Sequence, residues 1–231
     1  MLKSRFLLGV FVLIGCSPAL FAGPPEPPPP PVTLQGTGVG PIPDDATDNG
    51  GMGTPLEIRF EVEGYEVRTP DTVDAFINIA ISHTWAGDLT AILKAPNGGP
   101  EHTIFGRIGV NSSSTLGRSD DFNGQFYTFG LSIGDPNIWD TPGDPIPSGS
   151  YRTVESGNAS SASPPPVTNP ADTFSSVTNP NGTWILEVRD DISFDTGSVS
   201  SAFLTLINIV ESEELCIPVQ AENGGFSTVC L

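Results

Sequence analysis

Short runs in which hydrophobic and polar residues alternate recur along most of the chain, and no segment shows a sustained helical period of apolar residues. Successive side chains of a β-strand point to opposite faces, so a period of two predicts strands with one buried face. Asn-Gly pairs, which favour tight turns, separate several of the runs. The runs that predict strands are Leu56–Val62, Ala75–Ser82, Asp88–Lys94, Thr103–Phe105, Gln125–Phe129, Thr183–Arg189 and Ala202–Val210.

This pattern predicts an all-β sandwich. Glycine and proline number 26 and 24 among 231 residues, as expected of a chain that turns often. Residues 39–210 provide enough chain for one well-buried core and too little for two. We therefore expect a single β-sandwich domain over this range.

Two blocks of the sequence share one design, in which strand-like alternation is interrupted by a turn of Gly, Asp and small polar residues. The first block, residues 78–94, contains HTWAGDL, and the second, residues 181–206, contains GTWILEVRD followed by DTGSVSSAFLT. The two motifs in this order resemble the P domain, also called the P/Homo B domain, of proprotein convertases and many secreted bacterial proteins. The resemblance covers about residues 39–207 and implies a jelly-roll-like β-sandwich.

The N-terminus has the layout of a secretory signal peptide, with Lys3 and Arg5 before the apolar run Phe6–Ile14. Two cleavage sites remain open. Cleavage after Ala22 would release a secreted protein, whereas the lipobox that ends at Cys16 would make this cysteine the diacylated first residue of an outer-membrane lipoprotein. Either way we expect the protein outside the cell or at its surface, with lipid on Cys16 as its only membrane contact.

The domain organisation follows from these segments. Residues 1–22 are the expected signal peptide and residues 23–38 a spacer, in which seven of the eight residues from Pro24 to Pro31 are proline. Proline favours an extended, semi-rigid rod. The sandwich follows over residues 39–210 and a hairpin tail over residues 211–231. Within residues 131–179 we expect a long surface loop, mobile over Ser156–Pro170, with Trp139 as the aromatic residue to test for ligand contact.

The charge of the chain limits its partners. Of nine basic residues, Lys3 and Arg5 lie in the leader, so seven remain against 27 acidic residues and the net charge of residues 23–231 is −20. Nucleic acids and anionic lipids require the opposite sign. We expect an extracellular protein or glycan as the partner, and in convertases the P domain supports the folding of its neighbour.

Acidic residues gather in the predicted turns. Calcium takes six to eight oxygen ligands, so carboxylates brought to one rim of a sandwich would favour it. No EF-hand spacing is present, so the residues alone favour a solvated acidic turn for any single Asp, with a structural Asp88 that accepts hydrogen bonds from turn amides as an alternative. The resemblance raises calcium as a cofactor, because several P domains bind it. The candidate ligands are Asp88, Asp120, Asp121, Asp190, Asp191 and Asp195.

The sequence gives little sign of catalysis. His83 and His102 are the only histidines, and neither an HExxH nor a GxSxG motif is present. We expect no enzymatic activity and a structural role for His83. The resemblance nevertheless implies an association with serine endopeptidases, because P domains are commonly described together with the proteases that carry them. The alternative functions are a part in a serine-protease system, or a hydrolase that uses its acidic loops.

The C-terminal tail predicts a disulfide-linked hairpin. Cys216 and Cys230 stand near-symmetrically about a Glu-Asn-Gly-Gly turn. An exported protein meets an oxidising compartment, so we expect these two cysteines to pair. A sorting role for this tail is a second hypothesis.

Overall fold

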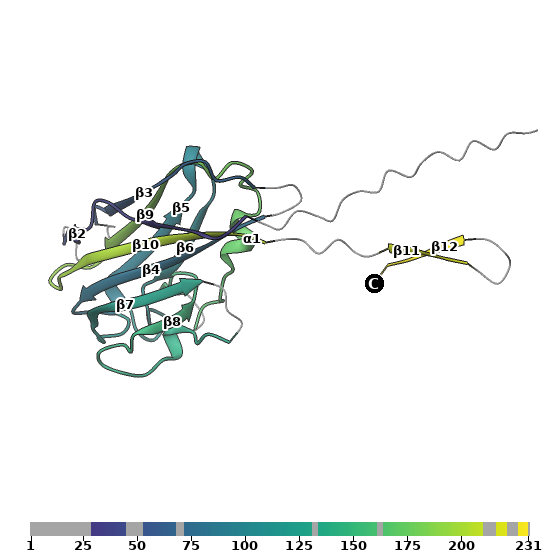
Figure 1. Ribbon diagram of the computed structural model, residues 1–231. Coiled ribbons are helices and arrows are strands. Elements are labelled where there is room, and N and C mark those ends of the chain that lie inside the picture. The colour runs from purple at the N-terminus through teal and green to yellow at the C-terminus, as the bar shows by residue number, and fades with distance from the viewer. Residues whose placement is uncertain are drawn as a thin grey trace, which may run out of the picture.

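The computed structural model describes residues 29–44, 53–67, 72–130, 134–160 and 164–209, and the backbone of two further strands at 216–220 and 226–230. Two β-sheets pack face to face into a sandwich, which confirms the all-β fold predicted from the alternation (Figure 1). No helix in the described part of the chain is long and apolar enough to cross a membrane.

The larger sheet has the strand order β1-β10-β4-β7-β8, and β2 also pairs with β10. All of these pairs are antiparallel except β7 with β8, which run parallel. The strands are β1 (Val32–Gln35), β2 (Gly40–Pro41), β4 (Thr72–His83), β7 (Phe122–Gly130), β8 (Gly149–Arg152) and β10 (Gly197–Ile209).

The smaller sheet has four antiparallel strands in the order β3-β9-β5-β6. The segment between β1 and β2 joins the two sheets, because Thr37 exchanges two backbone hydrogen bonds of 2.9 Å with Arg59. The strands are β3 (Leu56–Val62), β5 (Leu89–Lys94), β6 (Glu101–Gly106) and β9 (Gly182–Asp190).

The core fills the space between the sheets. Ile77, Ile79 and Ile81 of β4 are at most 1% exposed, and Trp184 of β9 is fully buried opposite them in the same cluster. The ring of Trp184 meets that of Phe174 edge-on at 5.0 Å. Since a buried side chain of this size contributes about 1.5–3 kcal/mol, this packing fixes the strands whose ends carry the motif residues.

The sandwich begins before the expected boundary at residue 39. Val32–Gln35, placed in the spacer by the sequence analysis, form β1 and pair with β10 from Phe203 to Leu206. Val32 and Leu34 alternate with Thr33 and Gln35 and are partly buried. Only four residues of strand pattern follow the proline run, so the sequence analysis assigned them to the spacer.

The long loop expected over residues 131–179 is in large part structured. It contains β8, a 3-10 turn η3 (Ile138–Asp140) and the helix α1 (Pro170–Phe174). Trp139, the aromatic residue singled out for ligand contact, is only 8% exposed, and Ile146, Tyr151 and Phe174 are buried in the core. These apolar residues do not recur at a strand or helix period in this Pro- and Gly-rich region, so the sequence pattern did not predict their burial.

The tail forms the predicted hairpin in its backbone. β11 (Cys216–Gln220) pairs antiparallel with β12 (Phe226–Cys230), and Cys216 lies directly opposite Cys230. The side chains of both cysteines, and the whole leader with Cys16, lie outside the described residues, so the disulfide and the lipid anchor stay predictions.

Candidate functional site

The two sequence blocks that carry the motifs meet at one end of the sandwich. The first block ends β4 at His83 and begins β5 at Leu89, and the second ends β9 at Asp190 and begins β10 at Gly197. His83 lies opposite Gly197 in the larger sheet, and Leu89 lies opposite Asp190 in the smaller sheet. The turn between β4 and β5 therefore crosses from one sheet to the other beside the turn between β9 and β10.

The turn of the first block is held by the loop before β7. This turn, η1 (Ala86–Asp88), donates two backbone hydrogen bonds of 2.9 Å, from Ala86 to Asp120 and from Gly87 to Arg118. A Cβ atom on Gly87 would lie 2.4 Å from the carbonyl oxygen of Leu116, so only glycine permits this close approach.

His83 links the two blocks through its ring. Its Nε2 lies 3.0 Å from Oδ2 of Asp190, and both side chains are completely buried. Its Nδ1 lies 2.9 Å from the carbonyl oxygen and 3.1 Å from the backbone nitrogen of Trp85. A carboxylate only accepts hydrogen bonds, so Nε2 donates to Asp190. Both ring nitrogens are thus engaged within the protein.

Asp88 is buried at this end without full compensation. It is 2% exposed, its Oδ1 has no hydrogen-bond partner, and its backbone oxygen accepts from the backbone nitrogen of Asp191 at 2.8 Å. Burial, and next the carboxylate of Asp190, raise the pKa of Asp88 from 3.8 to about 7, against smaller opposing effects of Arg107 and His83. The side chain is therefore a proton or cation acceptor near neutral pH.

Asp191 and Asp195 extend the acidic end. Thr90 donates to Oδ2 of Asp191 at 2.6 Å, but Oδ1 of Asp191 is buried without a partner. Burial raises the pKa of Asp191, although the hydrogen bond from Thr90 and the charge of Arg107 oppose the rise. Asp195 accepts from the hydroxyl of Thr84 at 2.7 Å.

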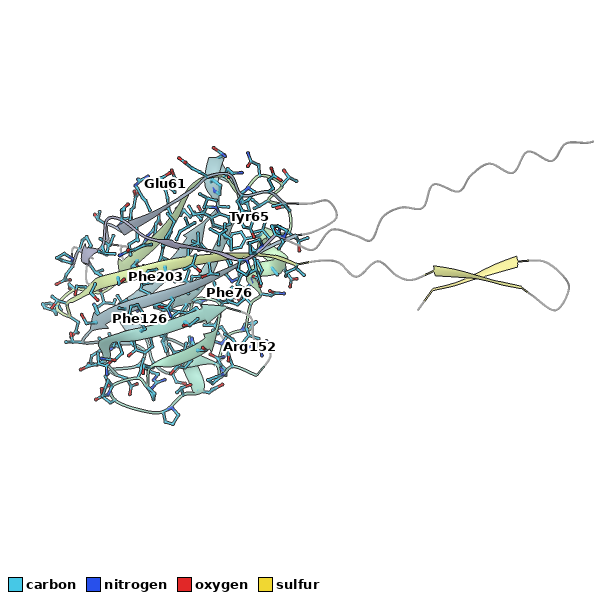
Figure 2. The ribbon with its side chains drawn as sticks, viewed as in Figure 1. Glu61, Tyr65, Phe76, Phe126, Arg152 and Phe203 are labelled. Atoms are coloured by element: carbon cyan, nitrogen blue, oxygen red, sulfur yellow. The ribbon has the colours of Figure 1, made fainter. Side chains whose placement is uncertain are left out.

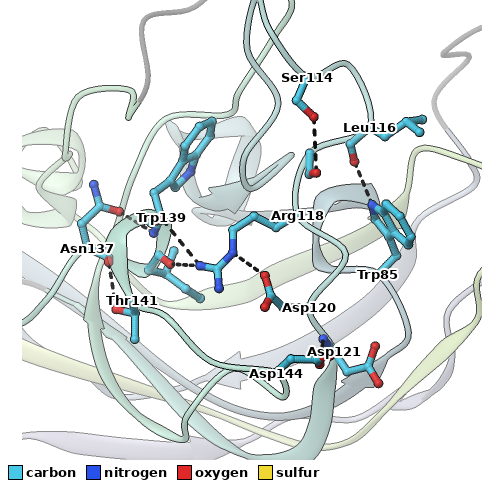
Figure 3. A network of polar contacts seen from close by, with 12 residues as sticks. Trp85, Ser114, Leu116, Arg118, Asp120, Asp121, Asn137, Trp139, Thr141 and Asp144 are labelled. Carbon is cyan, nitrogen blue, oxygen red and sulfur yellow. Dashed lines mark hydrogen bonds and ion pairs between the residues drawn. The ribbon is translucent and has the colours of Figure 1, made fainter.

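Asp120 and Asp121 lie in the loop before β7, where the side chain of Asp120 contacts Arg118 (Figure 3). Arg118 donates from Nε to Asp120 at 2.5 Å and from Nη1 to the carbonyl oxygen of Ile138 at 2.9 Å. The backbone nitrogen of Asp121 donates to Asp144 at 3.2 Å. These contacts tie the loop before β7 to η3, and they make Asp120 a partner of Arg118 rather than an unpaired carboxylate.

The structure thus divides the six candidate ligands into two groups. Asp88, Asp190, Asp191 and Asp195 lie at the joined motif turns, whereas Asp120 and Asp121 lie in the loop before β7. Among the described residues, no three His, Cys, Asp or Glu side chains converge closely enough to hold a metal ion. The oxygens that fit a cation best are the two buried ones without a donor, on Asp88 and Asp191.

Sequence reasoning missed Arg107, the basic residue whose charge acts on both Asp88 and Asp191. It follows β6 directly, and its Nη1 is buried without a hydrogen-bond partner. The sequence contained one signal for Arg107: basic residues are few in this chain, and this one stands two residues after the predicted strand Thr103–Phe105.

The second histidine lies away from the acidic end. His102 of β6 has Nδ1 2.7 Å from the hydroxyl of Thr173 in α1 and Nε2 3.0 Å from the hydroxyl of Thr153. Burial lowers the pKa of His102 to about 4. Its ring tilts against Phe174 at 5.9 Å, so it packs α1 onto the smaller sheet.

Comparison with known proteins adds nothing to this geometry: no family model matches the sequence, and no curated protein is similar to it.

Proposed function

We propose that this protein is a non-catalytic extracellular module of the P-domain type, which docks on a protein or glycan outside the membrane. The observation that carries the proposal is the use of the two histidines. Both are buried, and both ring nitrogens of each lie within hydrogen-bonding distance of the protein's own atoms. A general base needs a ring nitrogen that faces a substrate or a nucleophile.

The pair of His83 and Asp190 has two parts of a catalytic triad but lacks the third. In a triad, the nitrogen that is not bound to the acid faces a serine or cysteine. In His83 that nitrogen faces the backbone of Trp85 in its own turn. The pair therefore suits a structural connection between the blocks that resemble the P-domain motifs, and this use supports a module over a hydrolase.

The first test is an assay for hydrolysis. Purified protein is expected to leave casein, peptides with basic cleavage sites and common glycosides unchanged. A matched pair of variants decides the outcome. Activity that co-purifies with the wild type, survives Asp140→Asn at an exposed site and disappears in Asp190→Asn would establish a hydrolase and end the proposal.

Calcium belongs to the same proposal, as a stabiliser of the acidic end. Asp88 and Asp191 would supply carboxylate oxygens, and the cation would bind the two buried oxygens that have no hydrogen-bond donor. Its part is structural, since it would hold the two motif turns together.

Calcium is expected to raise the melting temperature relative to a chelator. A ligand that binds only the folded state stabilises it by about 2.7 kcal/mol at a hundredfold excess over the dissociation constant. The measurement belongs at pH 8, where Asp88 is ionised. Asp88→Asn is expected to abolish the calcium response and Asp140→Asn to keep it. Identical wild-type melting curves in calcium and in chelator would refute the calcium site.

A further inference from the structure

The outer faces of the two sheets differ in charge. The strands of the smaller sheet carry seven acidic and basic residues on or near their outer face, several of them in ion pairs: Glu57, Arg59, Glu61, Lys94, Glu101, Glu187 and Arg189. In the six strands of the larger sheet, the only Asp, Glu, Lys, Arg or His residues are Asp74, His83 and Arg152. Asp74 and His83 are 3% and 2% exposed. Within these strands, Arg152 is thus the one charged side chain that is not buried, so the outer face of the larger sheet is nearly neutral in a chain with a net charge of −18.

Three aromatic rings project from this neutral face. Phe76 of β4, Phe126 of β7 and Phe203 of β10 come from three neighbouring strands and lie on the same side of the sheet (Figure 2). Phe126 is 46% exposed. Its ring centroid lies 6.2 Å from that of Phe203, and Ala80, on the strand between them, is 3% exposed. We call these three residues and the polar positions around them the phenylalanine face.

A glycine makes room for the third ring. Phe76 of β4 lies beside Gly130 of β7, and a Cβ atom on Gly130 would be 2.0 Å from Cδ1 of Phe76. The ring therefore lies against the backbone of β7 in space that any other residue would fill. The side chain is supported from below and keeps one surface toward solvent.

Hydroxyl and amide groups stand between the rings. The strand register places Gln35, Phe203, Asn78, Thr128 and Ser150 in one row across five strands. Asn78 donates to the hydroxyl of Thr128 at 2.6 Å, and in the next row the hydroxyls of Thr33 and Thr205 lie 2.9 Å apart. Groups of this kind both donate and accept hydrogen bonds without carrying charge.

We propose that the phenylalanine face binds a neutral polysaccharide chain, a proposal that rests on the non-catalytic docking function. A sugar ring has an apolar C–H surface that fits an aromatic ring and hydroxyls that fit Asn, Gln and Thr. Binding sites of this sort join apolar and aromatic contacts to a few polar groups that fix orientation. Since the face has almost no charge, an uncharged ligand loses no ionic hydration there.

The charge of the molecule disfavours the other occupants. Two copies that each carry −18 repel one another, and an anionic membrane surface repels the same charge. A stable protein partner covers about 800 Å² on each side, with a largely apolar centre. Three partly exposed rings set among hydroxyls offer only a small apolar centre.

The test is native gel electrophoresis of the whole protein in gels that contain a soluble polysaccharide. Hydroxyethylcellulose, galactomannan, xylan and laminarin are the neutral probes, and alginate is the anionic control. At least one neutral probe is expected to retard the wild type, and alginate is not. Phe126→Ala with Phe203→Ala is expected to weaken the retardation by about tenfold in apparent dissociation constant. Phe194→Ala, which changes a ring 83% exposed at the acidic end, is expected to leave it unchanged.

Several results would overturn the assignment. These are retardation by none of the four neutral probes, retardation by alginate alone, or an equal loss in Phe194→Ala. A concentration-dependent dimer, seen by light scattering and lost in the double variant, would assign the face to a second copy instead. Circular dichroism and a melting curve check that the double variant folds. If it does not fold, the single variant Phe126→Ala replaces it in the binding test. Failure here leaves the non-catalytic function standing, whereas release of reducing sugar from a probe would refute that function itself.

Discussion

At the residue scale, the buried ionisable side chains of the acidic end differ in whether they have hydrogen-bond partners. His83 and Asp190 satisfy one another, so their burial is compensated by a hydrogen bond. Asp88 has no such partner at Oδ1, and burial shifts its protonation toward the neutral form. In the folded state, the ionised form of Asp88 is therefore disfavoured near neutral pH.

The stability of the protein is expected to depend on Asp88 between pH 4 and pH 7. Its folded pKa of about 7 lies above the unfolded value of 3.8, so the folded state binds the extra proton in this window. Its stabilising contribution is complete below about pH 4 and is lost as the pH rises through 7. At about 1.36 kcal/mol for each unit, the loss is at most about 4 kcal/mol.

Three other groups also make the stability depend on pH. Burial raises the pKa of Asp74 to about 6 and raises that of Asp191, so the contributions of both are also lost as the pH rises. His102 acts in the opposite sense, because its folded pKa of about 4 lies below the unfolded 6.5 and its contribution is lost as the pH falls. Comparison of the wild type with Asp88→Asn cancels the contributions that the two proteins share.

Denaturant unfolding at pH 5 and pH 8 measures that difference. The asparagine side chain introduced by Asp88→Asn has no proton to lose, so this variant is expected to gain stability relative to the wild type as the pH rises. Asp140→Asn at an exposed position serves as the control and should show a constant offset. A difference between wild type and Asp88→Asn that does not vary with pH would show that Asp88 ionises normally in the folded state.

Sequence reasoning found four of the acidic residues at this end but not their partners. Asp88 and Asp190 stand in recognisable turns, so their types and positions were readable. Thr90 and Arg107 act on Asp191 only because β5 and β6 pair with Thr90 opposite Gly106, the residue before Arg107. The register of this hairpin contains a β-bulge between Ala91 and Ile92, which the alternation of the sequence does not reveal.

At the scale of elements, β8 shows why the region after β7 escaped prediction. It runs parallel to β7, and parallel neighbours need a connection of a dozen or more residues. That connection covers residues 131–148, where prolines and glycines resemble an unstructured loop. By contrast β3, whose period-two alternation is uninterrupted, was predicted from Leu56 to Val62 as it stands.

The C-terminal hairpin is expected to carry the disulfide between Cys216 and Cys230. Directly opposed residues of an antiparallel pair have Cα atoms about 4.5–5.5 Å apart, which is within the range of a disulfide. In the chain-entropy model, closing a loop of about this length contributes roughly 3 kcal/mol. An isolated hairpin is marginal in water, so the bond would decide whether the tail is ordered.

Intact mass spectrometry of freshly exported protein, with and without reductant, tests this bond. The reduced protein is expected to be heavier by two hydrogens, and Cys216→Ser should remove the difference. Two free thiols in the exported wild type would refute the disulfide. Deletion of residues 216–231 with unchanged export would separately remove the sorting hypothesis.

At the scale of the whole molecule, the sandwich has two unlike ends. β4 runs from Thr72, which pairs with Ile209, to His83, which pairs with Gly197. The acidic turns therefore occupy one end, while the first strand starts and the last strand finishes at the other (Figure 1). The described chain therefore enters and leaves the sandwich at the end opposite the acidic turns.

This arrangement has a mechanical consequence. β1 is an edge strand, and its first residue, Val32, lies beside Leu206 near the end of β10. If tension draws the two chain ends apart, both pulls act on the same end of one antiparallel pair. The hydrogen bonds between β1 and β10 then break one after another, because the force acts on only one bond at a time. Under tension the sandwich would yield first by peeling away β1, and the acidic turns at the far end would be the last to feel the strain.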